Sequence, residues 1–350
     1  MHLSLPPKPG PAAKPGEFLF SAAGLAHGHI YGMVRGLLDA GATLSAVWDD
    51  DPLQVAAFLR AFPEAYAAES LDALLDDPSV RLVASAAVPS ERCALGLRVM
   101  VAGKDYFVDK APFTSSGQLA QVRRAVKETG RKYMVYYSER LHSEAATFAE
   151  HLIREGYIGR IIHMEGFGPH RLDAAIRPAW FFKKERTGGI LCDLGSHQLE
   201  QFLFFAGVQS ADITFARKAN LAHPEQPGFE DFGECAVRAA NGISGYFRVD
   251  WFTPDGLRTW GDGRTFLRGT DGYIELRNYI DLAAPTRCEN IVCWADKTGE
   301  HRFDATGKAG CPFFARLIRD CMERTETAMT QAHAFAAAGL CLQAQAIADA

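Results

Sequence analysis

Residues 188–197, Gly-Gly-Ile-Leu-Cys-Asp-Leu-Gly-Ser-His, place a carboxylate and an imidazole four positions apart behind a pair of glycines. On a helical turn this spacing puts Asp193 and His197 on one face, where both side chains can meet one ligand. The glycine pair lets a ligand approach the backbone closely. An isolated Asp-x-x-x-His is more often a helix cap beside a core histidine, so the segment gains meaning only from the rest of the chain.

A lysine occupies a second position where chemistry is expected. Lys110 closely follows Tyr106–Val108, an apolar run typical of a buried strand. A side chain at the carboxyl end of a parallel strand points into the crevice where such sheets bind ligands. Exposed lysines in turns are common, so Lys110 alone does not establish a site.

The first strand-like run ends in a glycine-bearing turn, Gly-Leu-Ala-His-Gly-His, that begins at Gly24. Backbone N–H groups at such a turn can receive a pyrophosphate, although the G-x-G-x-x-G spacing is missing. Asp49 follows the second run, where a dinucleotide-binding fold places a carboxylate on the adenine ribose. Asp51 and Pro52 suit the cap and first residue of the next helix, which leaves Asp49 for another role. An acid there repels a 2′-phosphate and the nearest following arginine is Arg60, so we expect NAD rather than NADP.

Short apolar runs alternate with helical patterns in the first 137 residues, which predicts a parallel sheet with helices on both faces. The expected strands are Phe18–Ala23, Leu44–Trp48, Leu82–Ala87, Tyr106–Val108 and Met134–Tyr136. The expected helices are Met33–Asp39, Pro52–Phe62, Glu91–Ala102 and Ser115–Thr129. Residues 1–16 hold five prolines and little that can pack, so we expect an extended or disordered arm outside the fold.

The pattern changes after about residue 140. A helix at Glu144–Glu155, a strand at Ile161–Phe167 and a helix after the Gly188-Gly189 pair come first. Strand-like runs that predict a mostly antiparallel sheet then follow at Asp212–Arg217, Glu234–Ala239, Ser244–Phe252, Arg264–Arg268, Tyr273–Arg277, Ile291–Trp294 and His301–Phe303. Helices at Phe313–Arg324 and Thr330–Ala348 close the chain.

The expected fold is α/β, with an N-terminal Rossmann-type parallel sheet domain followed by an α+β domain with a large, mostly antiparallel open sheet. The length of 350 residues suits about two domains. The expected parts are an arm at 1–16, a dinucleotide-binding domain at 17–137, a substrate-binding and oligomerisation domain at 138–311, and C-terminal helices that pack back on the body at 312–350.

The composition is ordinary for a soluble globular protein, with 48% hydrophobic and 23% charged residues and a formal net charge of −5. Lysine and arginine are scattered, which argues against nucleic acid and anionic membrane as partners. No stretch reaches the roughly 18 apolar residues that span a bilayer. Eight cysteines without a Cys-x-x-Cys pair indicate reduced thiols and a cytoplasmic location. Cys288 and Cys293 lack the neighbours that complete a zinc set, so no metal site is expected.

Lys110, Asp193 and His197 together resemble the site of the glucose-fructose oxidoreductase / inositol dehydrogenase / MocA (Gfo/Idh/MocA) family of two-domain dehydrogenases. The resemblance extends from Phe18 onward and rests on motifs that occur in the family's order. These motifs are Gly103–Lys110 (GKDYFVDK), which is similar to the family's GK-x-V-x-x-EKP strand end, Glu155–Ile161 (EGYIGRI), and Gly188–His197 continuing to Gly207.

The resemblance implies a second domain whose open sheet faces the nicotinamide and often forms homo-dimers or homo-tetramers. It also implies that His197 accepts the hydroxyl proton of a substrate, that Lys110 donates a hydrogen bond to the substrate oxygen, and that Asp193 orients the substrate or the pair. Lysine and histidine can exchange the acid/base role in this family, and the sequence leaves their roles open. The residues expected to contact the dinucleotide are Gly24, His27, Gly28, His29, Asp49, Ala87, Pro89, Asp109 and Lys110.

The chain departs from the family pattern near the expected nicotinamide pocket. Asp109 replaces the usual glutamate, and Ala111 separates Lys110 from Pro112. Residues 88–93 lack a histidine that is frequent in the family, and Phe181 stands where many members have arginine. The expected substrate contacts, each with interdomain packing as its alternative, are Arg140, His170, Arg171, Trp180 and Lys183, of which Arg171 or Lys183 suits a carboxylate or phosphate.

These residues favour an NAD-dependent dehydrogenase that acts on a secondary hydroxyl or carbonyl of a sugar, polyol or related hydroxylated metabolite. One alternative is a lyase or glycosidase that uses transient hydride transfer and regenerates its cofactor. Another is a non-catalytic dinucleotide-binding sensor, because a fold does not fix a function. Release of a leaving group without NADH accumulation distinguishes the first alternative from the dehydrogenase.

Overall fold

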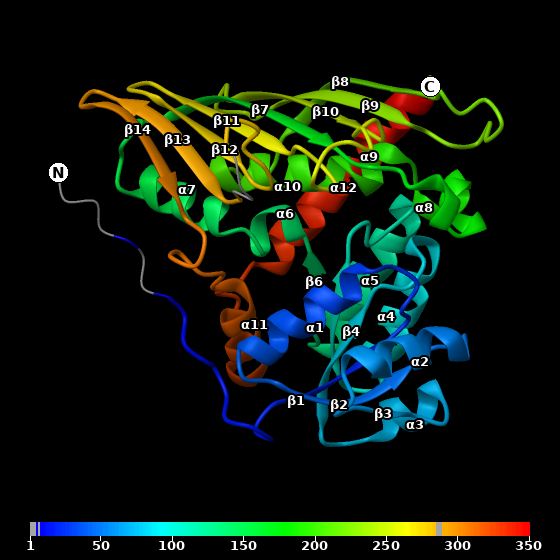
Figure 1. Ribbon diagram of the computed structural model, residues 1–350. Coiled ribbons are helices and arrows are strands. Elements are labelled where there is room, and N and C mark those ends of the chain that lie inside the picture. The colour runs from blue at the N-terminus through cyan, green and yellow to red at the C-terminus, as the bar shows by residue number, and fades with distance from the viewer. Residues whose placement is uncertain (1–4, 6–7, 285–288) are drawn as a thin grey trace. The chain divides into compact units, whose positions relative to one another are not determined.

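The computed structural model describes the chain except for residues 1–4, 6–7 and 285–288 (Figure 1). The chain divides into two compact units. We call Pro9–Tyr136 with Pro312–Phe335 the first unit, and Tyr137–Cys311 with Ala336–Ala350 the second unit. The segment expected at 312–350 is therefore shared between the two units.

In the described residues, the first unit contains a six-stranded sheet with strand order β3-β2-β1-β4-β5-β6, in which all pairs are parallel. Its strands are β1 (Leu19–Ala23), β2 (Thr43–Trp48), β3 (Tyr66–Ala67), β4 (Val80–Ser85), β5 (Asp105–Asp109) and β6 (Tyr133–Tyr136). Its helices are α1 (His29–Asp39), α2 (Pro52–Ala61), α3 (Leu71–Asp76), α4 (Arg92–Val101), α5 (Ser116–Thr129) and α11 (Phe313–Glu323), with a 3-10 turn η1 (Pro89–Glu91). The strand order reverses beside β1, and open α/β sheets bind ligands at the carboxyl end of such a point.

This order is that of the expected Rossmann-type domain, and all five predicted strands are present. The sequence pattern did not predict β3 or α3, because two and six residues carry too little periodicity. Ala86 and Ala87 were expected to end a strand, but β4 ends at Ser85. Both alanines are buried instead in the turn that follows, where Ala86 O accepts a hydrogen bond from His27 N at 2.9 Å.

Part of the proline-rich arm packs against the first unit. Ala12 N donates to Ala40 O at 2.8 Å, which ties the arm to the end of α1. Ala13 is buried beside Gly41, whose φ is +95°, and a Cβ on Gly41 would lie 2.3 Å from Ala13 O. Residues 9–16 therefore join the first unit, although their composition predicted an arm outside the fold.

The second unit contains, among its described residues, an eight-stranded sheet with strand order β14-β13-β12-β11-β7-β10-β9-β8. β7 and β10 are parallel and the other neighbours are antiparallel, as expected for a mostly antiparallel sheet. The strands are β7 (Ile161–Pro169), β8 (Asp212–Ala219), β9 (Phe232–Arg238), β10 (Ser244–Asp250), β11 (Arg264–Gly269), β12 (Tyr273–Arg277), β13 (Ile291–Asp296) and β14 (Gly299–Asp304).

Helices α7 and α10 lie along the same face of this sheet (Figure 1). Helix α10 packs closely on β7 because Gly166 has no side chain: a Cβ there would lie 2.0 Å from Gln198 Oε1. The helices of the unit are α6 (Ser138–Leu141), α7 (Glu144–Arg154), α8 (Lys184–Thr187), α9 (Ile190–Asp193), α10 (Gly195–Phe205) and the part of α12 (Gln331–Asp349) from Ala336, with 3-10 turns η2 (Ala174–Ile176) and η3 (Ala179–Phe182). Among the helices of the described residues, none has both the length and the hydropathy needed to span a lipid bilayer.

Candidate active site

The turn after β1 is shaped to lie against the residues that follow β4. Gly24 has a φ of +75°, and a Cβ on it would lie 2.6 Å from Ala87 Cβ. Ala86 N donates to Gly24 O at 2.9 Å. Helix α1 then begins at His29, with Gly28 as its N-cap. This backbone fits the phosphate-binding turn predicted from Gly24, because the amino end of α1 carries the positive end of the helix dipole.

A cavity of about 280 Å³ adjoins this turn. Gly24, Asp49 and Ala87, which were expected to contact a dinucleotide, line it. Leu25 N and Asp51 N donate to the two carboxylate oxygens of Asp49 at 2.6 and 2.9 Å, which fixes this carboxylate at the end of β2. The predicted capping role of Asp51 at the start of α2 is confirmed, and Asp49 lines the cavity as a separate group.

Carboxylates dominate the charged lining of this cavity. Asp50 and Glu91 line it with Asp49, and the lining Arg98 pairs with Asp72 at 2.5 Å. Burial and the neighbouring carboxyl of Asp50 raise the pKa of Asp49, while two backbone hydrogen bonds lower it. Ribose hydroxyls can donate hydrogen bonds to such groups, whereas a 2′-phosphate would meet negative charge.

Two imidazoles meet a buried carboxylate at the carboxyl ends of β1 and β5. His29 Nδ1 lies 2.8 Å from Asp109 Oδ1, and His27 Nδ1 lies 3.5 Å from Asp109 Oδ2. The two imidazole rings are edge to face, with their centroids 4.2 Å apart. A carboxylate only accepts hydrogen bonds, so His29 Nδ1 carries the proton of its contact with Asp109. The structure thus brings together three residues that were expected to contact the dinucleotide.

Arg92 completes this cluster, although the sequence pattern did not select it. The residue lies at the start of α4 and is 1% exposed. Nη2 donates to Asp109 Oδ2 at 3.0 Å, and Nε donates to Ala87 O at 2.7 Å. Nη1 donates to the backbone oxygens of Asp109, Lys110 and Ala111. Arg92 therefore ties the residues after β4 to the end of β5.

These contacts fix the charge state of the cluster. Burial alone would raise the pKa of Asp109, but the charges of His29 and Arg92 and the hydrogen bond from His29 hold that pKa well below its usual range. Burial and the charges of His29, Lys110 and Arg92 lower the pKa of His27, against the opposite effect of Asp109. At neutral pH, Asp109 is therefore ionised and His27 is uncharged.

His27, His29 and Asp109 are also possible metal ligands, since one ligand atom of each lies within 4.8 Å of the others. Two positive charges already act on these three residues. Arg92 donates a hydrogen bond to Asp109 Oδ2, and the charge of Lys110 lowers the pKa of His27. These charges oppose a bound metal cation. The expected lack of a metal site stays a prediction, and Cys288, considered above for zinc, lies outside the described residues.

Lys110 directly follows β5, as predicted, and is 3% exposed. The carbonyl of Lys110 and those of its two neighbours accept hydrogen bonds from Arg92, which fixes the backbone that carries the amine. Lys110 is thus held in the same unit as Asp49 and the His27, His29 and Asp109 cluster. Pro89, another expected dinucleotide contact, begins η1 directly after the cavity residues Ala87 and Val88.

Asp193 and His197 lie in the second unit, on the short helix α9 and on α10, which meet at Leu194. Ser196 Oγ donates to Asp193 O at 2.7 Å, which closes the turn between the helices. Asp193 is partly exposed and His197 is 1% exposed. Asp193 and His197 lie on consecutive helical turns, as their spacing predicts. The joint action of the two residues with Lys110 stays a prediction.

Two polar side chains hold the start of α9. Glu230 Oε2 accepts a hydrogen bond from Ile190 N at 2.8 Å, and Gln345 Oε1 accepts one from Leu191 N at 3.1 Å. Gln345 Nε2 also donates to both oxygens of Glu230 at 3.1 Å. Gly189 has a φ of +91°, and a Cβ on it would lie 2.3 Å from Gln345 Cδ. Gly189 therefore makes room for Gln345, a packing role that its sequence context did not predict.

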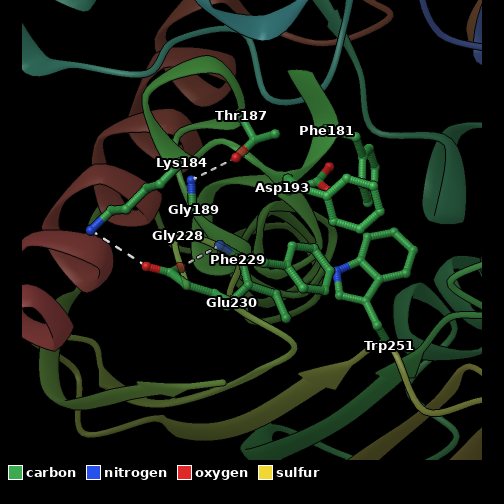
Figure 2. Close-up of a pocket in the computed structure, with 11 residues that line it drawn as sticks. Phe181, Lys184, Thr187, Gly189, Asp193, Gly228, Phe229, Glu230 and Trp251 are labelled. Atoms are coloured by element: carbon green, nitrogen blue, oxygen red, sulfur yellow. Dashed lines mark hydrogen bonds and ion pairs between the residues drawn. The ribbon is translucent and has the colours of Figure 1, made fainter. Parts of the chain in front are cut away.

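A small pocket with aromatic walls adjoins Asp193 (Figure 2). The rings of Phe181, Phe229 and Trp251 line it, and Figure 2 shows Asp193 beside Phe181. Lys184, which pairs with Glu230, also lines the pocket, with 3.4 Å between Nζ and Oε1. The volume of the pocket, about 10 Å³, suits a single water molecule. The residues that line the pocket therefore supply at most one wall of a substrate site.

The structure gives two of the expected substrate residues protein partners. Arg140 pairs through Nε and Nη2 with the buried carboxylate of Glu200, and its guanidinium lies 3.7 Å from the ring centroid of Phe204. Arg171 Nη2 donates to three backbone oxygens in the segment 254–259. Both guanidinium groups thus hold structural elements in place, and their contact with a substrate stays a prediction.

The remaining substrate candidates differ in their exposure. His170 Nδ1 lies 3.2 Å from Gly168 O, and Trp180 is partly exposed within η3. Lys183, directly after η3, is exposed. Arg177, which the sequence pattern did not select, lies over the ring of Phe181, 4.5 Å from its centroid.

A buried polar network beside α10 was also not predicted. Glu139 Oε2 accepts hydrogen bonds from Gln198 Nε2 at 3.0 Å and from Gln201 Nε2 at 3.5 Å. Thr265 Oγ1 donates to Gln201 Oε1 at 3.1 Å. The signal available in the sequence is the group of polar residues Gln198, Glu200 and Gln201, between His197 and the apolar Phe202–Phe205. This network helps to fix the helix that carries His197.

Two family models match the chain. The model described as "Oxidoreductase family, NAD-binding Rossmann fold" matches residues 26–137. The model described as "GFO/IDH/MocA C-terminal domain" matches residues 147–275. The chain belongs to the Gfo/Idh/MocA family. The resemblance and the fold class expected from the sequence are therefore confirmed.

This Gfo/Idh/MocA chain is similar to proteins of known activity over part of their lengths. D-xylose dehydrogenase of Paenarthrobacter nicotinovorans is 30% identical over 132 residues, which cover 36% of this chain and 34% of that protein. The NAD-dependent scyllo-inositol 2-dehydrogenase of Bacillus subtilis (strain 168) is 25% identical over 65% of this chain and 58% of that protein. A solved structure from Erwinia carotovora atroseptica SCRI1043, provisionally assigned as an oxidoreductase, is 47% identical with a TM-score of 0.92 and covers 95% of this chain and 98% of that one.

Two departures from the Gfo/Idh/MocA pattern are in direct contact in this member. Residues 88–93 lack the histidine that is frequent in the family and contain Arg92. Arg92 donates at 3.0 Å to Asp109, which replaces the usual glutamate. These two positions therefore form a buried ion pair in this chain.

Proposed function

We propose that this chain is an NAD-dependent dehydrogenase that acts on a secondary hydroxyl or carbonyl of a sugar, a polyol or a related hydroxylated metabolite. The observation that carries the proposal is the arrangement in the first unit, where a carboxylate-lined cavity at the strand reversal accompanies the buried Lys110 at the end of β5. The sugar and inositol dehydrogenases among the relatives support the substrate class.

Gly24, Asp49 and Ala87 would hold the adenosine part of NAD, and the start of α1 would face its pyrophosphate. Bound NAD supplies the hydride acceptor. In the proposed mechanism, Lys110 or His197 takes the hydroxyl proton of the substrate, and the other stabilises the substrate oxygen. Asp193 orients the substrate or this pair.

The reaction is tested by incubating the protein with NAD and a panel of sugars, polyols and sugar acids while NADH absorbance is followed. Formation of NADH with at least one member supports the dehydrogenase. A panel without NADH, in a protein that binds NAD, contradicts net oxidation of these substrates. Release of a leaving group under the same conditions would then identify transient hydride transfer, and its absence would favour a sensor.

The cofactor preference is tested at Asp49. Asp49→Asn keeps the shape of the side chain but removes the charge that would face a 2′-phosphate. We expect the ratio of kcat/KM for NADP to that for NAD to rise on the order of 10²-fold, because two charges near a protein surface interact by a few kcal/mol at close range. Asp39→Asn is the matched control, since Asp39 is an exposed aspartate at the end of α1 in the same unit and does not line the cavity. An unchanged ratio in Asp49→Asn would place the preference elsewhere.

The proposed assembly is a homo-dimer or homo-tetramer through the open face of the second unit's sheet. Aromatic rings on this face stand at exposed or partly exposed positions, namely Phe167, Tyr246, Phe266 and Tyr273. Closed symmetric assemblies are the common outcome for such surfaces. Light scattering on the purified protein should give twice or four times the chain mass, and a monomer would contradict the proposal.

The proposed location is the cytoplasm. Seven cysteines in the described part of the chain are free, in keeping with a reducing compartment. Fractionation of the source cells would place the protein, and recovery outside the cytoplasm would contradict this proposal.

A further inference from the structure

A continuous run of aromatic rings leads away from the small pocket beside Asp193. Phe181 and Trp251, which line that pocket, lie edge to face with their ring centroids 5.2 Å apart (Figure 2). The centroid of Trp251 lies 5.5 Å from that of His170, and the centroid of His170 lies 4.4 Å from that of Trp260. The run therefore connects the pocket to Trp260 through successive ring contacts within the second unit.

Trp260 is the most exposed of these rings. It is 41% exposed, whereas Phe181 and Trp251 are 4% and 6% exposed. Tyr279, which is partly exposed, extends the run, with its centroid 4.4 Å from that of Trp260. A large apolar ring that faces water loses the stabilisation that burial provides. We call these five residues the aromatic wall: Phe181, Trp251, His170, Trp260 and Tyr279.

Arg171 fixes the segment that carries Trp260. Its backbone N–H donates to Trp260 O at 2.7 Å, and its Nη2 donates to three backbone oxygens in the segment 254–259. At the start of the same segment, Thr253 N donates to His170 O at 3.2 Å. Arg171 thus positions the exposed part of the aromatic wall, which is a use for its guanidinium that needs no contact with a substrate.

Two glycines let the chain pack closely just after Trp260. A Cβ on Gly261 would lie 2.4 Å from Pro169 O, at the end of β7, and a Cβ on Gly263 would lie 3.0 Å from Tyr279 Cε2. The backbone next to Trp260 is therefore held against its neighbours. A ligand that binds the indole would not have to immobilise this segment, so the entropic cost of binding is low.

The aromatic wall lies near both candidate catalytic residues of the second unit. Its inner end lines the pocket beside Asp193. Its middle approaches α10, because His170 Nε2 lies 3.9 Å from Glu139 Oε1 and Glu139 Oε2 accepts a hydrogen bond from Gln198 Nε2 at 3.0 Å. Gln198 directly follows His197 on α10. A ligand on the exposed indole would thus share one wall with Asp193.

We propose that Trp260, supported by His170 and Tyr279, binds the C–H face of a cyclic sugar or a cyclic polyol. The inference rests on the proposed dehydrogenase function and restricts the substrate to a ring. The face of an indole carries negative charge density, and C–H groups on carbons that bear hydroxyls are polarised toward positive charge. A ring presents several such groups on one face, whereas an open chain must first lose conformational freedom. The hydroxyls at the edge of the ring can still donate to a carboxylate such as Asp193.

The first arm of the test measures contact with the indole and needs no turnover. All five tryptophans of the protein are replaced by fluorotryptophan, and Trp260→Phe identifies the ¹⁹F signal of Trp260. NADH is supplied in place of NAD, so that alcohols are not oxidised. The ring compounds D-xylose and myo-inositol should shift the Trp260 signal to saturation. The open-chain compounds xylitol and D-glucitol should bind about tenfold more weakly.

The second arm uses NAD and the ring substrate of the panel with the highest rate. Trp260→Ala should raise the KM for this substrate about tenfold and change kcat by less than about threefold, because the indole contacts substrate and transition state alike. Trp260→Phe keeps an aromatic face and should recover much of the affinity. Phe252→Ala is the matched control and should match wild type, since Phe252 is also 41% exposed on the same segment but its ring lies beside His223.

A Trp260 signal that no sugar moves, or that open chains move as strongly as rings, would overturn the proposal. An unchanged KM in Trp260→Ala, or a higher kcat/KM for an open chain than for every ring compound, would overturn it too. A signal that moves with protein concentration instead of with sugar would assign the indole to a contact between two copies of the chain.

The ¹⁹F arm uses the wild-type residue, so it decides the proposal even where Trp260→Ala lowers the melting temperature. If the wild-type protein forms no NADH with any substrate, the dehydrogenase proposal fails. The Trp260 signal still shows in that case whether the aromatic wall binds sugar rings.

Discussion

NADH formation by a Lys110→Met variant should fall about 10³-fold below wild type at saturating substrate and NAD. Methionine keeps most of the apolar stem but has no nitrogen that exchanges a proton or donates to the substrate oxygen. Lys110 is 3% exposed, so bulk water does not easily replace its amine. Initial rates measure the chemistry, and NADH fluorescence measures cofactor binding, which the variant should retain.

Lys127→Met is the matched control, because Lys127 is an exposed lysine on α5 of the same unit. Lys110→Arg adds a second comparison, since a guanidinium keeps the charge but does not give up its proton in proteins. An arginine variant as active as wild type would assign Lys110 an electrostatic role. A methionine variant within about threefold of wild type would leave the acid/base role to His197, and His197→Asn would then be the inactive variant.

The long elements of the fold were predictable from sequence because each repeats one periodicity many times. The helix expected at Ser115–Thr129 is present at Ser116–Thr129, and the strand expected at Ser244–Phe252 is present at Ser244–Asp250. Short elements carry no such repeat, and α8, with four residues, was not predicted. Its end depends on Gly188, whose left-handed backbone stops the helix.

The roles of candidate-site residues were predictable from the sequence where the interaction that decides the role is local. Asp49 and Asp51 could be assigned different roles because a helix cap acts within three residues. The partners that position the groups come from far along the chain, where no local pattern records them. Arg92 and Asp109 are 17 residues apart and in contact. Arg140 was predicted as a substrate contact with packing as its alternative, and its partner Glu200, 60 residues away, could not be read from a local pattern.

Replacing Arg92 with methionine should destabilise the first unit by about 3 to 5 kcal/mol, because the carboxylate of Asp109 would stay buried without its guanidinium. Four backbone oxygens, those of Ala87, Asp109, Lys110 and Ala111, would lose their donor as well. The melting temperature should fall on the order of 10 °C. Arg92→Lys should recover only part of the lost stability, since a single ammonium group cannot make all the hydrogen bonds that the planar guanidinium makes to the residues at the ends of β4 and β5.

Asp109→Asn completes a double-mutant cycle with Arg92→Met and gives the sign of the pH dependence. Although burial alone would raise the pKa of Asp109, His29 and Arg92 hold it well below its usual range. Its contribution to stability is therefore complete above the unfolded pKa of about 4 and is lost as the pH falls below that value. Urea midpoints of wild type should fall more steeply below about pH 4 than those of Asp109→Asn. The coupling energy should exceed about 1 kcal/mol, and additive effects would mean that Arg92 acts through the backbone oxygens alone.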